Sequence, residues 1–338
     1  MSDLATATAA PPTTWEEYRT ELTAYCYRML GSSADAEDAV QDTMVRAWRA
    51  FDRFEGRSSV RSWLYKIATN VCLTMLDGRQ RRARPMDFGP AGSADGPVPE
   101  TRPEIAWLEP IPDARVLPTA ADPAELAVSK ESVRLAFVAA LQHLPARQRA
   151  VLILREVLQW KAAEVAELLG TTVASVNSAL QRARATLAEN DLDSPSPGDM
   201  DADHQELLTR YAEAFERYDV NALVTLLHED AILNMPPYDL WLQGAGEIQK
   251  WFVGPGAECE GSRLVPLAAN GMPGFGHWRR NPDGSGYHAW AVQVLEITDG
   301  LISGYTSFLD VDTLFPMFGL PLKLDADGNP LEDRATEG

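Results

Sequence analysis

The sequence predicts a multidomain protein with two all-α helical domains followed by an α+β domain. Hydrophobic residues recur at helical spacing through residues 13–84 and 124–190. Residues 203–320 instead begin with helical patterns and continue as alternating, strand-like segments. A Pro-rich linker at 85–123, with eight prolines between residues 85 and 118, separates the two helical domains. We expect a polar tail after the last domain, at 321–338.

Composition narrows the classes of protein to consider. The chain has 338 residues, of which 45% are hydrophobic, and a formal net charge of −19. No apolar run is long enough to span a bilayer, and residues 1–12 lack the basic start and apolar core of a secretory signal. The three cysteines lie far apart, which argues against a disulfide framework or a structural zinc site. We therefore expect a cytoplasmic protein without a metal or cofactor.

The charge is distributed unevenly along the chain. Residues 44–84 carry ten basic and three acidic residues, whereas residues 191–338 carry 25 acidic and eight basic residues. A cationic stretch in an acidic protein indicates a polyanionic partner bound at one place. The alternative is a solvated helix face, along which arginine stems cover apolar surface.

Two helices are expected in the first helical domain, over 36–54 and 59–77. The apolar stripe of the first helix consists of Val40, Met44, Ala47, Trp48 and Phe51. The outward face of the second helix is expected to present Arg61, Ser62, Tyr65, Lys66, Thr69 and Asn70. The first helix also carries acidic residues on the outward side of its start.

Residues 161–187 have the pattern of a helix-turn-helix. A short helix ends at Gly170, a residue suited to the left-handed turn after a helix, and a second helix follows. The second helix and its start offer side chains able to reach bases or phosphates: Thr172, Ser175, Ser178, Gln181, Arg182 and Arg184. This pattern predicts DNA binding, and the alternative is an ordinary helical hairpin.

Three segments, in this order, resemble the extracytoplasmic-function (ECF) group of sigma-70 family RNA polymerase sigma factors. They read AYCYRMLGSSADAEDAVQDTMVRAWRAF (24–51), FEGRSSVRSWLYKIATNVCLTML (54–76) and LPARQRAVLILREVLQWKAAEVAELLGTTVASVNSALQRARA (144–185). The resemblance covers both helical domains. It implies a sigma-2 domain at 13–84, a helix-turn-helix sigma-4 domain at 124–190, and core RNA polymerase and promoter DNA as partners.

The resemblance also implies roles for particular residues. Polymerase binding falls on Asp35, Glu37, Asp38, Gln41 and Asp42, whose charge would complement basic side chains. Contact with the −10 element falls on Arg61, Tyr65, Lys66 and Asn70, and phosphate contact on Arg79, Arg81, Arg82 and Arg84. Trp63 is expected in the core. The helix at 172–185 would read the −35 element. The family usually has an acid near Thr74 and a base near Asp77, and this chain has neither, so the detail of −10 recognition differs.

The last domain, at 203–320, resembles the SnoaL-like family of α+β cones. The resemblance lies mainly in YAEAFERYDVNALVTLLHEDAILNMPP and in the spacing of Trp241, Gly244, Ile248 and Trp251. Enzymes with this fold use a pocket acid or histidine as a general base, and the candidates are Asp239, His277, Tyr287, His288 and Trp290. No pair of them has the spacing of a known catalytic set, so we expect a scaffold rather than an enzyme.

The fused cone is expected to regulate the sigma factor by touching the linker, with Trp107 and Leu108 as apolar contacts. Two alternatives remain at this point. One is a one-component helix-turn-helix regulator that senses a small ligand in the cone. The other is a bifunctional protein with isomerase- or cyclase-type activity in the cone.

Overall fold

Helical spacing in the first part of the chain produces three packed helices. The computed structural model describes residues 13–331 except 57, 98–100, 103–104, 120–121 and 190–201. The first helical unit contains, after a short 3-10 turn at Thr13–Tyr18, helices α1 (Arg19–Leu30), α2 (Ser33–Ala50) and α3 (Val60–Leu76). The Ser32 hydroxyl accepts a hydrogen bond from the Asp35 amide at 3.0 Å and caps α2, and Ser59 caps α3 in the same way.

The second helical unit contains the helix-turn-helix. Its helices are α5 (Pro123–Glu131), α6 (Leu135–Gln142), α7 (Ala146–Leu152), α8 (Ala162–Leu169) and α9 (Val173–Glu189), with a π-helical turn at Ile153–Val157. Gly170 takes a left-handed conformation with φ of 61° and ends α8, as the sequence predicts. Val176, Leu180 and Ala183 of α9 are buried against the other helices of this unit.

The segment between the two helical units packs against its neighbours. It includes a 3-10 turn at Pro85–Asp87 and helix α4 (Asp113–Val116). Single bridges join Ala83 to Trp107 within this segment, and Pro112 to Ala269 of the last domain. The linker therefore runs along the boundary between the helical units and the sheet.

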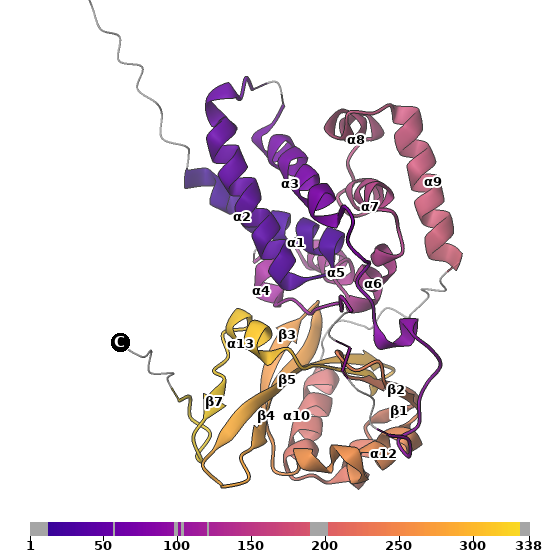
Figure 1. Cartoon of the computed structure of the whole chain (residues 1–338), viewed down its shortest axis with the longest axis vertical. Helices are drawn as coiled ribbons and strands as arrows, with labels where there is room; N and C mark the ends of the chain where they lie inside the picture. The colour runs from indigo at the N-terminus through magenta and orange to yellow at the C-terminus, as the bar shows by residue number, and fades with distance from the viewer. Residues whose placement is uncertain are drawn as a thin grey trace, which may run out of the picture.

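The last domain, here called the cone (α10 to β7), is a curled mixed sheet, with α10 and α12 on one face and α13 on the other (Figure 1). Its helices are α10 (Ala202–Glu216), α11 (Val220–Val224), α12 (Ala245–Val253) and α13 (Val311–Met317). Its strands are β1 (Leu227–Asn234), β2 (Trp241–Gln243), β3 (Arg263–Ala269), β4 (Met272–Arg280), β5 (Tyr287–Thr298), β6 (Leu301–Phe308) and β7 (Lys323–Leu324).

The strand order is β2-β1-β6-β5-β4-β3, and only the β1–β6 pair is parallel among the described strands. β5 and β6 meet in the hairpin at residues 298–300 that the turn residues predict. Register shifts in β4–β5 and β5–β6 bend the sheet. One sheet face packs against α10 and α12, and the other continues the apolar core of the helical units.

The end of the chain differs from the expected polar tail at 321–338. β7 pairs with β5 in antiparallel register, and Leu324 is buried in the sheet. Leu324 lies between Lys323 and Asp325, and this alternation of polar and apolar residues is enough for a short strand. Residues 332–338 of the expected tail lie outside the described residues.

Figure 1 shows the helical units in its upper half and the cone in its lower half, with β3 and β5 running toward the helices. One apolar cluster extends from α1–α3 through α6–α9 to Ala269, Met272 and Trp278 of the cone. The three units therefore share a core. No helix in the described ranges is both long and apolar enough to cross a membrane.

Candidate functional site

The acidic side of α2 is only partly available for a partner. Asp38 and Gln41 are exposed. Asp35, Glu37 and Asp42 each form an ion pair within the chain, with Arg82 at 2.6 Å, Arg115 at 3.0 Å and Arg46 at 2.8 Å respectively. The five predicted polymerase-binding residues thus share one helix, but three of them are already paired.

The same helix presents two exposed apolar side chains, of which the predicted pattern assigned only Trp48 to the core. Trp48 is 60% exposed and Val45 is 40% exposed. The prediction that Trp48 belongs to the buried stripe is wrong, because α1 and α3 cover α2 on a narrower arc than the stripe assumed. Gln41, Val45 and Trp48 lie at i, i+4 and i+7, so they extend the exposed face that begins at Asp38.

The outward face of α3 also differs from its prediction. Lys66 and Asn70 are exposed, and Arg61 is half-buried and forms an ion pair with Glu21 at 2.7 Å. Tyr65 is fully buried, so the expectation that it lies on the outward face of α3 is wrong. Its ring lies 5.2 Å from that of Trp160, and its hydroxyl donates to Glu21 at 3.3 Å.

The reason is that α3 is covered on two sides. Thr69, also expected on the outward face, is buried and its hydroxyl lies 2.8 Å from that of Tyr25. Trp160 of the second helical unit covers α3 on another side, next to Tyr65. The apolar stripe in the sequence marks only the side that faces α1 and α2.

A cleft of about 680 Å³ lies between the start of α3 and α8. Its lining residues are Arg53, Phe54, Glu55, Ser58, Ser59, Ser62, Trp63, Lys66, Trp160, Glu164, Glu167 and Leu168. Trp63 packs against Trp15 and Phe54, as expected for a core residue, while one side of it also faces the cleft. Lys66 of α3 and the acids Glu164 and Glu167 of α8 therefore line the same cleft.

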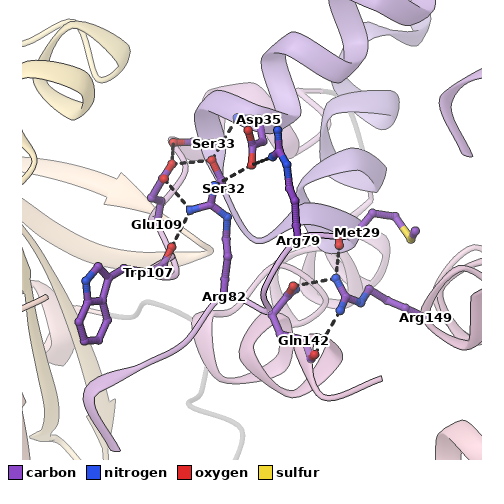
Figure 2. A network of polar contacts seen from close by, with 10 residues as sticks. All are labelled: Met29, Ser32, Ser33, Asp35, Arg79, Arg82, Trp107, Glu109, Gln142 and Arg149. Carbon is purple, nitrogen blue, oxygen red and sulfur yellow. Dashed lines mark hydrogen bonds and ion pairs between the residues drawn. The ribbon is translucent and has the colours of Figure 1, made fainter. Parts of the chain in front are cut away.

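The basic segment after α3 is engaged with acids of the same chain. Arg82 donates to Asp35 at 2.6 Å, to Glu109 at 2.8 Å and to the Trp107 carbonyl at 2.7 Å (Figure 2). Arg79 is exposed and reaches Asp35 at 3.1 Å. Arg82 is thus turned inward, whereas Arg79 keeps much of its surface in solvent.

Arg81, the third of the predicted phosphate contacts, lies beside a histidine and an acid. It is exposed, with the Asp87 carboxylate 3.5 Å away and the His143 ring nitrogen at 3.1 Å. Burial and the Arg81 charge lower the pKa of His143. Arg84 points elsewhere, and its Nε is buried without a hydrogen-bond partner among the described residues.

The linker residues predicted to touch the cone occupy different positions. Trp107 packs against Phe88 at 5.5 Å and donates to the Arg102 carbonyl, and its backbone meets Arg82 and Ala83, so its described contacts are with the linker and the end of the first helical domain. Leu108 is buried and lines a cavity together with Ile232 of the cone. The assignment of Trp107 as the apolar contact to the cone is therefore not supported by its described contacts.

The main contact between the cone and the helical units was missed from the sequence. Asn270, at the tip of the β3–β4 hairpin, is fully buried. Its amide nitrogen donates to the Tyr27 hydroxyl of α1 and to the Val133 carbonyl, both at 2.7 Å. Its side-chain oxygen accepts from the Ile111 amide at 3.0 Å, and its backbone amide donates to the Ile111 carbonyl at 3.0 Å.

The signal that could have found this contact is the Asn270-Gly271 pair. Both residues have positive φ, of 58° and 70°, as a two-residue hairpin turn requires. The Gly271 amide donates to Asp113 of α4 at 2.7 Å, and burial raises the pKa of Asp113 to about 6. A Cβ at Gly271 would lie 2.9 Å from Lys130 Cβ, so only glycine fits here.

The DNA-reading face predicted for α9 is intact. Six side chains are exposed on the helix and at its start: Thr172, Ser175, Ser178, Gln181, Arg182 and Arg184. The Thr172 hydroxyl accepts from the Ser175 amide at 3.1 Å and caps the helix. Arg184 forms an exposed ion pair with Glu156 at 2.7 Å, a contact that is weak and easily exchanged.

The five candidate pocket residues of the cone do not converge on one pocket. His277 is 1% exposed, within a network of hydrogen bonds to Ser262 and Gln293, and burial lowers its pKa to about 3. Asp239 forms an ion pair with Arg102 of the linker at 3.2 Å.

The other three candidates follow one another along the start of β5. His288 bonds to Asn281 at 2.8 Å, the Arg279 guanidinium lies 3.3 Å from the ring centre of Trp290, and Arg263 lies over the ring of Tyr287 at 5.9 Å. No metal-binding cluster of acids, histidines and cysteines occurs in the described ranges. Nothing in this geometry brings a general base to a substrate-sized cavity.

Comparison with known families matches all three units of the chain. Residues 14–82 match sigma-70 region 2, residues 134–187 match sigma-70 region 4, and residues 208–305 match the SnoaL-like domain. These matches confirm the resemblances that the sequence motifs predict, in the same order along the chain.

Two relatives from Mycobacterium tuberculosis match over nearly the whole chain. The ECF RNA polymerase sigma factor SigG is 49% identical over 315 residues, which are 90% of this chain and 82% of SigG. The ECF RNA polymerase sigma factor SigJ is 29% identical over 322 residues, which are 91% of this chain and 94% of SigJ.

The crystal structure of SigJ from the same organism also has this fold. It aligns with a TM-score of 0.57 at 24% identity and covers 91% of this chain and 99% of SigJ. The helical units followed by a SnoaL-like domain are therefore a shared architecture. This chain belongs to the ECF RNA polymerase sigma factors, which direct transcription initiation from promoters, and it carries a SnoaL-like domain fused behind its two sigma regions.

Proposed function

We propose that the cone holds this sigma factor in a closed form, and that promoter recognition requires the cone to release the two helical units. The observation that carries the proposal is the burial of Asn270 among Tyr27, Ile111 and Val133. These three partners belong to the first helical unit, the linker and the second helical unit. A single side chain of the cone thereby ties together all the other parts of the chain.

Charge pairing in the closed form supports the proposal. Asp35 is a proposed polymerase contact and Arg82 a proposed DNA contact, yet each neutralises the other in Figure 2. Glu109 of the linker adds a second carboxylate to Arg82 and accepts from Ser32 at 2.7 Å. Both residues can meet a partner only after this network opens.

The cleft between α3 and α8 supports closure in the same way. Lys66, the exposed cation of the proposed −10 element, faces a space also lined by Glu164 and Glu167. Two carboxylates next to this cation oppose the approach of a DNA phosphate. Separation of α3 from α8 removes that repulsion and frees both faces of the cleft.

In the open form, each unit has one task. The face of α2 around Asp38 and Trp48 binds core polymerase, since it combines acids with an exposed aromatic anchor. Lys66 and Asn70 of α3 hold the melted −10 strand, and α9 reads the −35 element in the major groove. The cone contributes no chemistry in this proposal, because its candidate residues do not form a catalytic arrangement.

The test is the affinity of the purified full chain for core RNA polymerase, measured for Asn270→Ala. Loss of several buried hydrogen bonds destabilises the closed form by about 1–3 kcal/mol, so the affinity should rise about tenfold or more. Asn281→Ala is the matched control, because Asn281 lies in another turn of the cone and, among the described residues, its side chain bonds to cone residues alone. Equal affinities for the two variants, with both correctly folded by circular dichroism, would rule out closure by Asn270.

A further inference from the structure

A cavity of about 130 Å³, partly open to solvent, lies where the linker, the second helical unit and the cone meet. It is on the sheet face opposite α10, so it is distinct from the interior of the cone. Residues 83–86 and Leu108 form one wall, Leu135 and Ala136 of α6 form a second, and strands β1, β5 and β6 form the third. Each of the three parts of the protein therefore contributes to it.

Two opposite charges line this cavity. The first is Glu296 of β5, and burial raises the pKa of its carboxyl. The charges of Arg84 and Arg134 act in the opposite direction on this pKa. Arg84 also lines the cavity, and its Nε is buried without a hydrogen-bond partner in the described ranges. Arg84 and Glu296 form no ion pair with each other in the same ranges, so the Arg84 Nε remains without a partner while both charged side chains line the cavity.

The remaining walls are partly polar and partly apolar. Asn234 donates to the Thr306 hydroxyl at 3.1 Å, and Ser303 donates to the Glu296 carbonyl at 3.3 Å. Apolar side chains complete the lining: Met86, Leu108, Leu135, Ile232 and Phe308. A pocket that is apolar in part and carries a few separated polar groups has the character of a small-molecule site.

We propose that this cavity binds a small zwitterion, and that an α-amino acid of the size of glycine or alanine is the ligand class. Its ammonium group contacts the Glu296 carboxylate, and its carboxylate accepts from the Arg84 guanidinium. A cavity of about 150 Å³ holds benzene, so one slightly smaller accommodates about five or six non-hydrogen atoms.

Charge selects a zwitterion over simpler ions. A lone cation at Glu296 leaves the Arg84 Nε unsatisfied, and a lone anion at Arg84 meets the Glu296 carboxylate. A molecule with both charges satisfies both groups at once, and charge-assisted hydrogen bonds are the strong ones. The alternative is that two water molecules occupy the cavity and bridge the two charged groups, in which case amino acids would not bind.

Binding has a consequence for the whole chain, because the walls move apart when the protein opens. A ligand that binds only the closed form stabilises that form by mass action. The effect on transcription therefore rests on the closure proposed above, whereas binding itself is a property of the cavity.

The test is isothermal titration calorimetry of the full chain with L-alanine and with glycine. Acetate and methylammonium, each of which carries one of the two charges, serve as ligand controls. We expect L-alanine to bind at least tenfold more tightly than either control ion. No heat from either amino acid, or a control ion that binds as tightly as L-alanine, would overturn the proposal.

Variants locate the binding. Glu296→Gln should weaken L-alanine at least tenfold, whereas Glu229→Gln, which removes an exposed acid from β1 of the same sheet, should leave it unchanged. Ala136→Leu fills the cavity without altering any charge and should abolish binding even if Glu296→Gln fails to fold. Retention of wild-type affinity by a folded Ala136→Leu variant would place the ligand elsewhere and contradict the proposal.

The failures of the two proposals can be told apart by adding L-alanine to the core-polymerase affinity assay. If L-alanine binds but leaves the polymerase affinity unchanged, the cavity is a ligand site and the closure is wrong. If L-alanine does not bind while Asn270→Ala still raises the affinity, the closure holds and the ligand site is wrong.

Discussion

Arg28 of α1 and Arg149 of α7 reach across the contact between the two helical units in opposite directions. Arg28 donates to the carbonyl and hydroxyl of Ser132, at 3.0 and 2.6 Å, and Arg149 donates to the Met29 carbonyl (Figure 2). Both side chains are buried, and neither meets a carboxylate in the part of the chain that the structure describes. Burial lowers the pKa of each guanidinium to about 10.

Within this contact, hydrogen bonds rather than ion pairs hold the two buried guanidinium groups. Arg149→Lys keeps the charge but loses the planar fork that also serves Gln142 and the Leu144 carbonyl. We expect the free energy of unfolding to fall by about 1–3 kcal/mol, measured by urea denaturation. Arg147→Lys, an exposed neighbour on the same helix, should change it by less than about 0.5 kcal/mol. Equal effects would show that the fork is unimportant.

Tyr65 and Lys66 are adjacent in α3 but should behave differently. Tyr65→Phe removes only the hydroxyl hydrogen bond to Glu21, so we expect a loss of about 1 kcal/mol in stability and unchanged promoter melting. Lys66→Ala should reduce melting severalfold, because the exposed ammonium is available to a phosphate. Melting is followed by 2-aminopurine fluorescence in the −10 region. If Tyr65→Phe impairs melting as strongly as Lys66→Ala, the tyrosine leaves the core during initiation.

Local patterns predicted α2, α3 and the helix-turn-helix well. Gly170 and the cap at Thr172 act through contacts within a few residues, so the sequence around them contains the cause. All six predicted contacts of α9 and its start are exposed for the same reason: this helix packs on one side only. The turn at Thr298–Gly300 is likewise set by its own residues.

Features that depend on distant partners could not be predicted in this way. Tyr65 is buried because Trp160 packs on it across nearly a hundred residues of sequence. The pairing of Asp35 with Arg82, and the insertion of Asn270, depend equally on how the units meet. Sequence motifs identified the charged groups, but not that the protein pairs them with each other.

The exposed face of α9 predicts a specific dependence on salt. Arg182→Ala removes one cation from the outer side of the helix, so binding to −35 DNA should weaken and the slope of log affinity against log salt should decrease by about 1. Arg184→Ala should have a smaller effect, because Arg184 must first leave Glu156. Fluorescence anisotropy with duplex DNA at several salt concentrations measures both. An unchanged slope for Arg182→Ala would remove this arginine from the interface.

Asp113, which contacts the cone through Gly271, should make the stability of the protein depend on pH. Burial raises its pKa from 3.8 to about 6, against the Gly271 hydrogen bond and the Lys130 charge. The folded state binds this proton more tightly than the unfolded state, so the stabilisation is complete below 3.8 and is lost as pH rises through 6.

Asp113→Asn keeps an acceptor for Gly271 and cannot ionise. Its melting temperature, relative to wild type, should therefore increase between about pH 5 and about pH 8. Asp122→Asn, at the start of α5, controls for the loss of a helix-capping carboxylate. A difference that stays constant with pH would mean that Asp113 does not titrate in this range.

His277, inside the cone, should make the stability of the protein depend on pH in the opposite direction. Burial, with smaller contributions from Arg279 and His288, lowers its pKa from 6.5 to about 3. The unfolded state then binds the proton more tightly, so the stabilisation is complete above 6.5 and is lost as pH falls toward 3. A general base needs a pKa near the working pH, and a histidine kept neutral by burial does not fulfil that need.

His277→Gln replaces the ring with an amide that can still meet both partners but cannot be protonated. Thermal unfolding of wild type should therefore be more sensitive to acid than that of the variant, between about pH 7 and about pH 4. His228→Gln, on β1 and only partly buried, is the matched control and should follow wild type. Parallel curves for wild type and His277→Gln would mean that the ring keeps an ordinary pKa, and the cone would then contain a histidine able to act as a base.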